Sequence, residues 1–351
     1  MSRMSLLEVL EPLRRWSREG VPAGLATLVR AQRSAPRRPG ARFAVNDVGE
    51  LAGSVSSGCI EGDLHEHLQQ ILAGGPPRLL SYGITDEMAA EVGLACGGEI
   101  EVFADRYVAE DPTWAALREV IERSRPAILM TGISGRLEGR RLLAAEGDEP
   151  VGSLEADERD ARLIERARPL LDSGSTDLLE VIDEGESAIV FVEPVLPPPR
   201  LAIVGASPVA ASLCHLAAFV GFEVFVIDPR RAFLSPEAFP DAARILEAWP
   251  DAGLEEVGLD RFASVVVLAH DRKLDLPALE AALRAGCRFV GQIGGKRTQR
   301  LRREALADLG IEGSEIARLR GPVGLDIGSD TPEEIALAIL AEVVAVQHGR
   351  A

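Results

Sequence analysis

The sequence has few cysteines and no apolar run long enough to cross a membrane. Its four cysteines lie at positions 59, 96, 214 and 287, and no two of them form a CxxC pair. Such spacing gives neither a disulfide framework nor a metal-ligand pattern. Residues 1–20 lack the continuous apolar segment of a signal peptide. We therefore expect no disulfide, no metal site and no membrane span, and a cytoplasmic location.

Basic residues are also scarce relative to acidic ones. The 38 Lys and Arg residues are outnumbered by 55 Asp and Glu residues, which gives a net charge of −17. This balance argues against nucleic acid as the main partner. Hydrophobic residues make up 46% of the chain, as in a globular protein.

The 351 residues suggest at least two domains. The stretch VLPPPR at 195–200 is typical of a stiff, extended linker. We predict an N-terminal domain over 1–196, a proline-rich linker at 197–200 and a C-terminal domain over 201–351. We find no internal repeat in the sequence.

The two domains differ in their expected elements. The first has mixed helical and strand patterns, with a helix over 60–72, whereas the second alternates strands and helices from 201 to 309. Such alternation predicts a parallel sheet. The fold class is therefore α/β, with an N-terminal mixed α/β domain and a Rossmann-like, doubly wound C-terminal domain.

The C-terminal domain opens with the turn VGASPVA, at 204–210. Gly205 follows the first strand, and Asp228 ends the next one, as in dinucleotide-binding folds. Ser207 and Pro208, however, stand where a pyrophosphate would approach, so NAD(P) binding is only weakly indicated. A second turn, GQIGGKRTQR, adds Gly294 and Lys296 as candidate anion-binding residues. The sequence TPEE from Thr331 predicts a helix cap.

A cluster of arginines stands out in this acidic chain. The segment VRAQRSAPRRPGAR carries Arg30, Arg33, Arg37, Arg38 and Arg42. Guanidinium groups bind phosphate well. The same residues would also suit a solvated loop that pairs with acids elsewhere.

Two cysteines lie beside glycines and small residues. Cys59 ends SSGC and precedes a predicted helix, whose N-terminus favours a thiolate and a bound anion. Cys96 precedes two glycines. The alternative is that each thiol is a small buried side chain. The candidates from these motifs are Ser56, Ser57, Gly58, Cys59, Cys96, Gly97 and Gly98.

These motifs resemble the XdhC/CoxI family, the accessory proteins of xanthine dehydrogenase and related molybdenum hydroxylases. The resemblance is carried by SAPRRPGARFAVNDVGELAGSVSSGCIEGDL, GLACGGEIEVF and long stretches of the C-terminal half. It covers about 16–108 and 201–346. The family usually has a glycine and a histidine where this chain has Ser207 and Pro208.

The resemblance implies a cofactor-maturation chaperone rather than an ordinary enzyme. Such proteins bind the molybdenum cofactor, assist its sulfuration and deliver it to a hydroxylase, with a cysteine desulfurase as the sulfur donor. By this resemblance the arginine loop and either cysteine would handle the cofactor, and the protein would act as a homodimer. The alternatives are an NAD(P)-dependent oxidoreductase that uses the C-terminal domain and a diverged scaffold that contacts a hydroxylase without handling the cofactor.

Overall fold

The computed structural model describes residues 2–32, 35–83, 98–183 and 185–350. The chain forms two compact units, Met1–Pro197 and Pro198–Ala351. Each unit is described below by itself.

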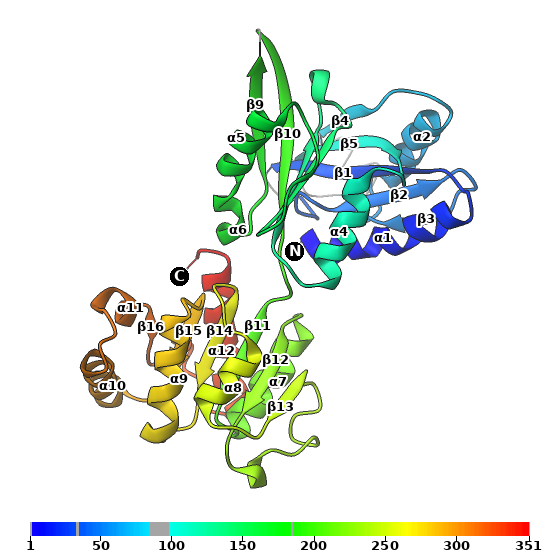
Figure 1. Ribbon diagram of the computed structural model, residues 1–351. Helices are drawn as coiled ribbons and strands as arrows, with labels where there is room; N and C mark the ends of the chain where they lie inside the picture. Colours follow the sequence, from blue (N-terminus) through cyan, green and yellow to red (C-terminus); the bar gives the residue numbers. More distant parts are fainter. Residues whose placement is uncertain (1, 33–34, 84–97, 184, 351) are drawn as a thin grey trace. The chain divides into compact units, whose positions relative to one another are not determined.

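The first half of the N-terminal unit forms sheet A, which has five strands (Figure 1). The strand order is β3-β2-β1-β5-β4, and every neighbouring pair is antiparallel. Its elements are α1 (Ser2–Arg18), β1 (Ala23–Gln32), β2 (Arg42–Asn46), β3 (Leu51–Gly53), α2 (Glu61–Leu72), β4 (Arg78–Gly83) and β5 (Glu99–Tyr107).

The second half of this unit forms sheet B, with the strand order β8-β7-β6-β10-β9. Its elements are α4 (Pro112–Glu122), β6 (Ala127–Gly132), η1 (Gly135–Leu137), β7 (Arg141–Ala145), β8 (Val151–Gly152), α5 (Asp157–Ala167), α6 (Pro169–Ser173), β9 (Asp177–Asp183) and β10 (Glu186–Val195). The order of strands along the chain and across the sheet is the same as in sheet A.

The registers of the two sheets match residue by residue. Thr27 of β1 is paired with Arg42 and Phe103, and Thr131 of β6 is paired with Arg141 and Phe191 in the same way. The unit is therefore a structural repeat of one α-β-β-β-α-β-β motif, and the prediction that the chain has no internal repeat is wrong. The repeat escapes sequence inspection because its halves keep their strand pairing but differ in loop length and in most side chains.

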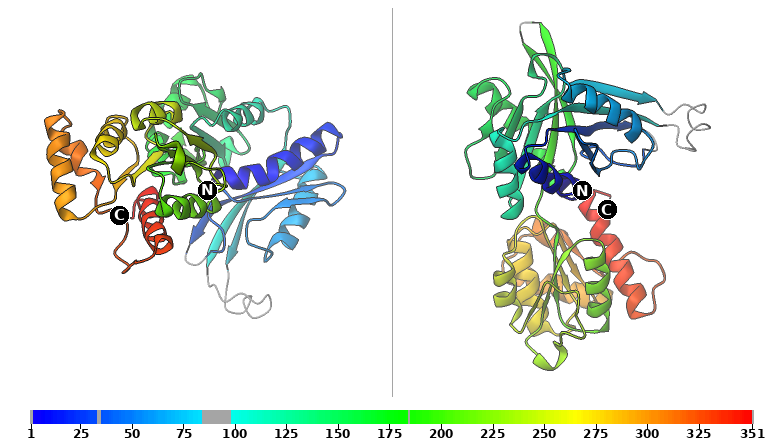
Figure 2. Two further views of the ribbon diagram at one scale, coloured as in Figure 1. Left: turned by 90° about the horizontal axis from the view of Figure 1, so that it is seen from below. Right: turned by 90° about the vertical axis from the view of Figure 1, so that its right-hand side faces the viewer.

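The two sheets pack against each other through one face of each. Val29 and Phe103 of sheet A form a small core with Ile133 and Phe191 of sheet B. Helix α1 packs on β2 and β3, and α4 packs on β7 and β8. Helix α2 covers the other face of sheet A, with Leu64, Leu68 and Ile71 buried (Figures 1 and 2).

The C-terminal unit contains a six-stranded sheet C with the strand order β13-β12-β11-β14-β15-β16. All its strand pairs are parallel. Its elements are β11 (Arg200–Val204), α7 (Pro208–Phe219), β12 (Glu223–Ile227), η2 (Arg231–Phe233), β13 (Arg244–Leu246), α8 (Pro250–Val257), β14 (Ala263–Val267), α9 (Arg272–Arg284), β15 (Phe289–Gln292), α10 (Lys296–Asp308), α11 (Gly313–Ala317), β16 (Leu319–Arg320) and α12 (Pro332–Gln347).

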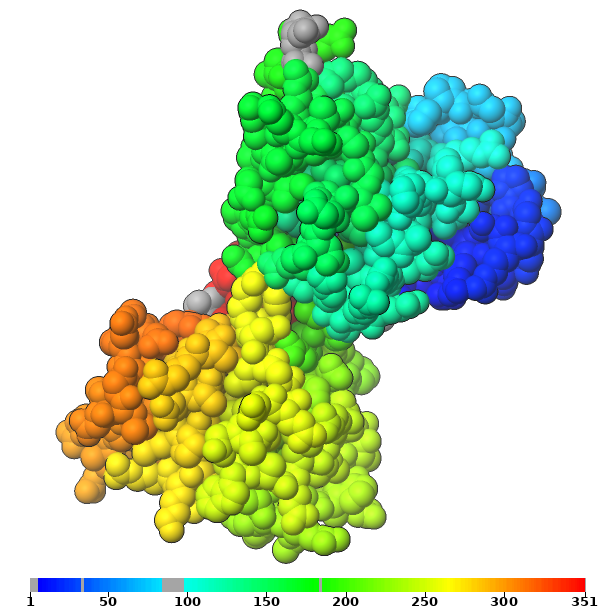
Figure 3. Space-filling view, in the orientation of Figure 1, coloured from blue at the N-terminus to red at the C-terminus, as the bar shows by residue number. Residues whose placement is uncertain are grey.

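Helices cover both faces of sheet C. One core joins the sheet to α7 and α12, and the other joins it to α8, α9 and α10 (Figure 2, right). The latter helices form the yellow and orange surface of this unit in Figure 3. A doubly wound parallel sheet in the C-terminal unit, following a mixed α/β unit in the sequence, confirms the predicted fold class. Thr331 caps α12 with the predicted capping box to Glu334.

Candidate functional site

The ends of several strands lie along one edge of sheet A, the edge that runs across the strand direction. Strand β1 ends there at Gln32, which is paired with Glu99 at the start of β5, and β4 also ends there at Gly83. Strand β2 starts near the same edge, and Gly53 at the end of β3 is paired with Phe43. The arginine loop and the loop before Cys59 therefore both leave sheet A at this edge.

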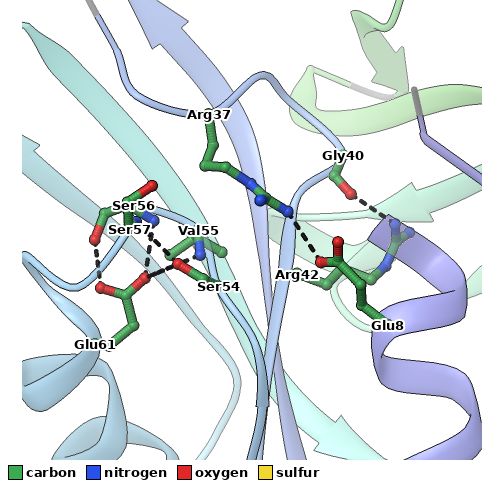
Figure 4. A network of polar contacts seen from close by, with 9 residues as sticks. All are labelled: Glu8, Arg37, Gly40, Arg42, Ser54, Val55, Ser56, Ser57 and Glu61. Atoms are coloured by element: carbon green, nitrogen blue, oxygen red, sulfur yellow. Dashed lines mark hydrogen bonds and ion pairs between the residues drawn. The ribbon is translucent and has the colours of Figure 1, made fainter. Parts of the chain in front are cut away.

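The arginines at 30–42 have different environments, and Arg30 and Arg42 lie in β1 and β2 rather than in the loop between these strands. Arg30 lies 3.3 Å from the carboxylate of Glu101, and Arg37 donates to Glu8 over 3.0 Å (Figure 4). Arg38 is exposed, and no ion pair found among the described residues includes it. Arg33 lies outside the described residues. Arg38, and Arg37 after release from Glu8, are thus the cations that an anionic ligand could meet.

Arg42 has a structural partner instead. Its side chain is 2% exposed and forms a two-oxygen ion pair with Glu193 of β10, and it also donates to the carbonyl of Gly40 over 2.9 Å. Glu193 is itself completely buried. Recruiting Arg42 to a ligand would break this buried ion pair, so the geometry gives no support to the predicted cofactor contact.

The loop between β3 and α2 holds Cys59 in a half-buried position. Its thiol packs at the margin of the core under α2. Ser57 and Gly58 have positive φ angles of 62° and 109°, which turn the chain into the helix. The hydroxyl of Ser56 accepts from the N–H groups of Cys59 and Ile60 over 3.0 and 3.1 Å.

Glu61, the first residue of α2, organises this loop and was not among the predicted site residues. Its carboxylate accepts hydrogen bonds from the Ser54 hydroxyl (2.5 Å), from the Ser56 hydroxyl, and from the N–H groups of Val55 and Ser56 (3.1 and 2.9 Å; Figure 4). It also accepts from the N–H group of Gly58 over 2.9 Å. A carboxylate directly after a serine- and glycine-rich turn is the sequence signal for such a role.

These contacts have an electrostatic consequence. Partial burial opposes ionisation of Glu61, but the hydrogen bonds from Ser54 and Ser56 outweigh it and lower its pKa from 4.5 to about 2. The loop N–H groups that were expected to attract an external anion already have acceptors in Glu61 and Ser56. The loop is therefore held by its own hydrogen bonds. The Cys59 side chain remains as the chemically distinctive group of this loop.

The second cysteine motif lies mostly outside the described residues. This applies to Cys96 and Gly97, whereas Gly98 is buried just before β5. Gly98 precedes the start of β5, which lies at the edge of sheet A described above.

In the C-terminal unit, the predicted dinucleotide residues are engaged with one another. The carboxylate of buried Asp228 accepts from Ala206 N–H over 2.8 Å and from the backbone and side chain of Arg230 over 2.7–2.9 Å. Ser207 caps α7 by accepting from Ala210 N–H over 3.2 Å. Gly205 has φ +102°, and a Cβ there would lie 2.6 Å from the backbone of Ala269.

This arrangement bears on NAD(P). The acid that would bind a ribose and the hydroxyl at the second turn position both have partners within the protein. The Rossmann-like fold is shared with dinucleotide-binding proteins. Among the described residues of this unit, no contact beyond the fold supports NAD(P) binding. Gly294, with φ +127°, and exposed Lys296 stand at the junction of β15 and α10, where the carbonyl of Gly294 accepts from Gln299 over 3.2 Å.

The described residues offer neither a metal cluster nor a membrane helix. Within 2–32, 35–83, 98–183 and 185–350, no three His, Cys, Asp or Glu side chains gather as a metal site. Over the same ranges, we find no helix with the length and apolar character needed to cross a bilayer.

Comparisons with known proteins agree across both units. The model of the "XdhC and CoxI family" matches residues 16–83, and that of the "XdhC Rossmann domain" matches 201–343. A Bacillus subtilis protein, named as a probable xanthine dehydrogenase subunit, is 28% identical over 327 residues, covering 92% of each chain. The "Molybdenum cofactor insertion chaperone PaoD" of Escherichia coli is 26% identical over 328 residues, covering 93% of this chain and 84% of PaoD.

A solved structure has the same fold. The crystal structure of a protein described as a xanthine dehydrogenase from Bacillus halodurans matches with a TM-score of 0.72 and 24% identity, over 97% of this chain and 96% of that one. At this identity the match concerns the fold, and it includes both units.

Proposed function

Because the chain belongs to the XdhC and CoxI family, we propose that it binds the molybdenum cofactor, assists its sulfuration and delivers it to a xanthine dehydrogenase-type hydroxylase. The names of the relatives in Bacillus subtilis and Escherichia coli support an accessory role of this kind. Sulfuration and delivery are the finer part of the proposal.

The observation that carries the proposal is the shared edge of sheet A. The arginine loop and the Cys59 loop leave sheet A at the same edge, and β5, which follows the Cys96 motif in the sequence, begins there, which supports a shared site. A phosphate-bearing cofactor that needs a thiol nearby would find cations and a thiol within the same group of loops.

We assign separate tasks to the residues of this edge. Arg38 and Arg37 would attract the cofactor's phosphate, and Arg37 would exchange Glu8 for it. The half-buried Cys59 would either contact the cofactor or relay sulfur, and Cys96 is the second candidate for the same step. When bound, the cofactor would supply the molybdenum centre that accepts the sulfur.

The partners follow from the same proposal. A molybdenum hydroxylase would receive the cofactor, and a cysteine desulfurase would supply the sulfur. We propose that the protein acts in the cytoplasm as a homodimer. Light scattering of the purified protein would test the dimeric state.

The main test is the activation of an apo-hydroxylase with protein purified from cells that make the cofactor. The wild-type protein should carry molybdenum and pterin and should activate the client. Cys59→Ser should fold normally and fail to support activation, because serine keeps the size and loses the sulfur chemistry. Cys214→Ser is the control, since Cys214 is buried in α7. Purified wild-type protein without pterin would contradict the proposed cofactor binding. Full activation by Cys59→Ser would contradict the proposed role of Cys59.

The arginines are tested in the same assay. Arg37→Ala/Arg38→Ala should weaken cofactor binding and make the remaining binding less sensitive to salt. Arg123→Ala/Arg166→Ala removes the same charge from exposed sites in the second half of the unit and should have little effect. If the wild type and Arg37→Ala/Arg38→Ala bind the cofactor with equal affinity at low salt, the arginine loop does not bind its phosphate.

A further inference from the structure

Helix α5 in the second half of the N-terminal unit begins with a copy of the Glu61 contact network. Asp160 lies in its first turn, and its carboxylate accepts from the Ser153 hydroxyl over 2.6 Å and from the N–H groups of Leu154 and Glu155 over 3.2 and 3.1 Å. Glu61 accepts from Ser54, Val55 and Ser56 in the same way. We call each set of contacts a carboxylate clasp.

The register shows that the clasps occupy equivalent positions. Gly53 is paired with Phe43, and Gly152 is paired with Leu142, at the ends of β3 and β8. The segments that follow align without a gap, as GSVSSGCIEGDL at 53–64 and GSLEADERDARL at 152–163. The alignment matches Glu61 with Asp160 and Cys59 with Glu158.

The clasps differ in what they hold. The Glu61 clasp extends one step further, because its second oxygen also accepts from Gly58 N–H, next to Cys59. Among the contacts found for Asp160, none reaches that part of its loop. The loop of the second half contains no cysteine, and its Glu155 pairs with Arg136 and Arg159. The half with the cysteine is therefore also the half in which the carboxylate reaches the residue before it.

We propose that Glu61 is a positioning residue for Cys59, holding residues 54–58 so that the thiol faces its reaction partner, and that Asp160 braces the equivalent loop for stability alone. This proposal rests on the role of Cys59 in the proposed function. It explains why a longer side chain, Glu rather than Asp, stands in the first half, since the extra methylene extends the clasp to Gly58.

The test compares Glu61→Ala with Asp160→Ala in the full-length protein, because each variant removes one complete clasp. Alkylation of Cys59 by iodoacetamide is measured in a Cys96→Ser background. Burial raises the pKa of Cys214 to about 11 and that of Cys287 to about 12, so those thiols react slowly. Glu61→Ala should raise the alkylation rate several-fold, because loosening of residues 54–58 exposes the half-buried thiol. Asp160→Ala should leave it unchanged, although both variants lower the melting temperature.

Activation of the apo-hydroxylase is measured alongside, with Cys96 intact. Glu61→Ala should lose most of the activation and Asp160→Ala should keep it. Glu61→Gln is the control for a folding defect, because it keeps the size of the side chain. In either orientation its amide NH₂ would face at least one backbone N–H donor and could not accept from it. This variant should therefore behave like Glu61→Ala. Equal alkylation rates in the wild type and in Glu61→Gln, or equal rate changes from both alanine variants, would overturn the positioning role.

The two proposals can fail separately. If Cys59→Ser still activates the client, the role of Cys59 in the proposed function fails, and the positioning role fails with it. If Cys59→Ser is inactive while Glu61→Gln is fully active with normal alkylation, only the positioning role fails.

Discussion

Arg42 shows how burial decides what a charged residue can do. From the sequence it is one of five arginines in a basic loop, whereas in the structure it is enclosed with Glu193. Removing one partner of such a pair leaves an uncompensated buried charge, which costs about 3–5 kcal/mol. Arg38, a few residues away, is exposed and free of that cost. Residue type alone did not separate the two.

Asp228 supports a prediction about pH. Burial opposes its ionisation, but hydrogen bonds from Arg230 and from the N–H of Ala206 outweigh burial and lower its pKa. A lowered folded-state pKa stabilises the protein above the unfolded-state value of about 4, and this stabilisation is lost as the pH falls through the folded-state pKa. Asp228→Asn should therefore destabilise the protein by about 1–3 kcal/mol at pH 7.

The measurement is urea unfolding of wild type and variant at pH 7 and at pH 3. The difference between them should shrink at the lower pH, and exposed Asp308→Asn should show no such change. Titration of the wild type with NADH belongs to the same experiment. If the wild type binds NADH with micromolar affinity and Asp228→Asn does not, our interpretation that Asp228 only stabilises the turn after β11 is contradicted. That result would support the oxidoreductase alternative.

At the scale of elements, the repeat is most visible in two glycines that end edge strands. Gly53 has φ +70° and Gly152 has φ +82°. A Cβ at Gly53 would lie 2.3 Å from the carbonyl oxygen of Arg42, and one at Gly152 would lie 2.4 Å from that of Arg141. The same backbone approach thus recurs at the start of both clasp loops.

We predict that Gly53→Ala and Gly152→Ala destabilise the protein by similar amounts. The positive φ costs about 1–2 kcal/mol, and the backbone clash adds about 1–3 kcal/mol. Gly49→Ala is the matched control, because Gly49 has φ +88° with nothing within 4 Å of its Cβ position, so only the first cost applies. Thermal melts of the three variants would check this order, and a Gly49 variant as unstable as the other two would contradict it.

At the scale of the whole molecule, the two halves of the N-terminal unit depend on each other. Arg42 of the first half pairs with Glu193 of the second, and Arg141 of the second pairs with Asp105 of the first. Both pairs are buried, and each arginine also donates to the carbonyl two residues before it. The exchange is reciprocal, so each half supplies the counter-charge for a buried arginine of the other.

A fragment of residues 1–110 should therefore not fold by itself. It would contain Arg42 without Glu193 and Asp105 without Arg141, and it would expose Val29 and Phe103, which pack on the second half. Circular dichroism and amide exchange should show little protected structure in this fragment, whereas the fragment 1–197 should be folded. A cooperative thermal transition in 1–110 would refute this interdependence.

The sequence by itself determined the elements that depend on local chemistry. The alternating pattern from residue 201 onward predicts the parallel sheet because each buried strand and each amphipathic helix has its own periodicity. The cap at Thr331 needs only Glu334, three residues away. The motifs around Cys59 and the arginine loop could likewise be identified from residues adjacent in the chain.

Tertiary structure decided what depends on residues far apart in the chain. Glu193 lies 151 residues from Arg42, so no local pattern could distinguish Arg42 from Arg38. The short strands β3 and β8 are defined by their neighbours in the sheet, and with them the repeat and the position of Glu61 became visible. The arginine loop and the Cys59 loop are separated along the chain, and they share one edge only because antiparallel pairing fixes where each strand of sheet A begins and ends.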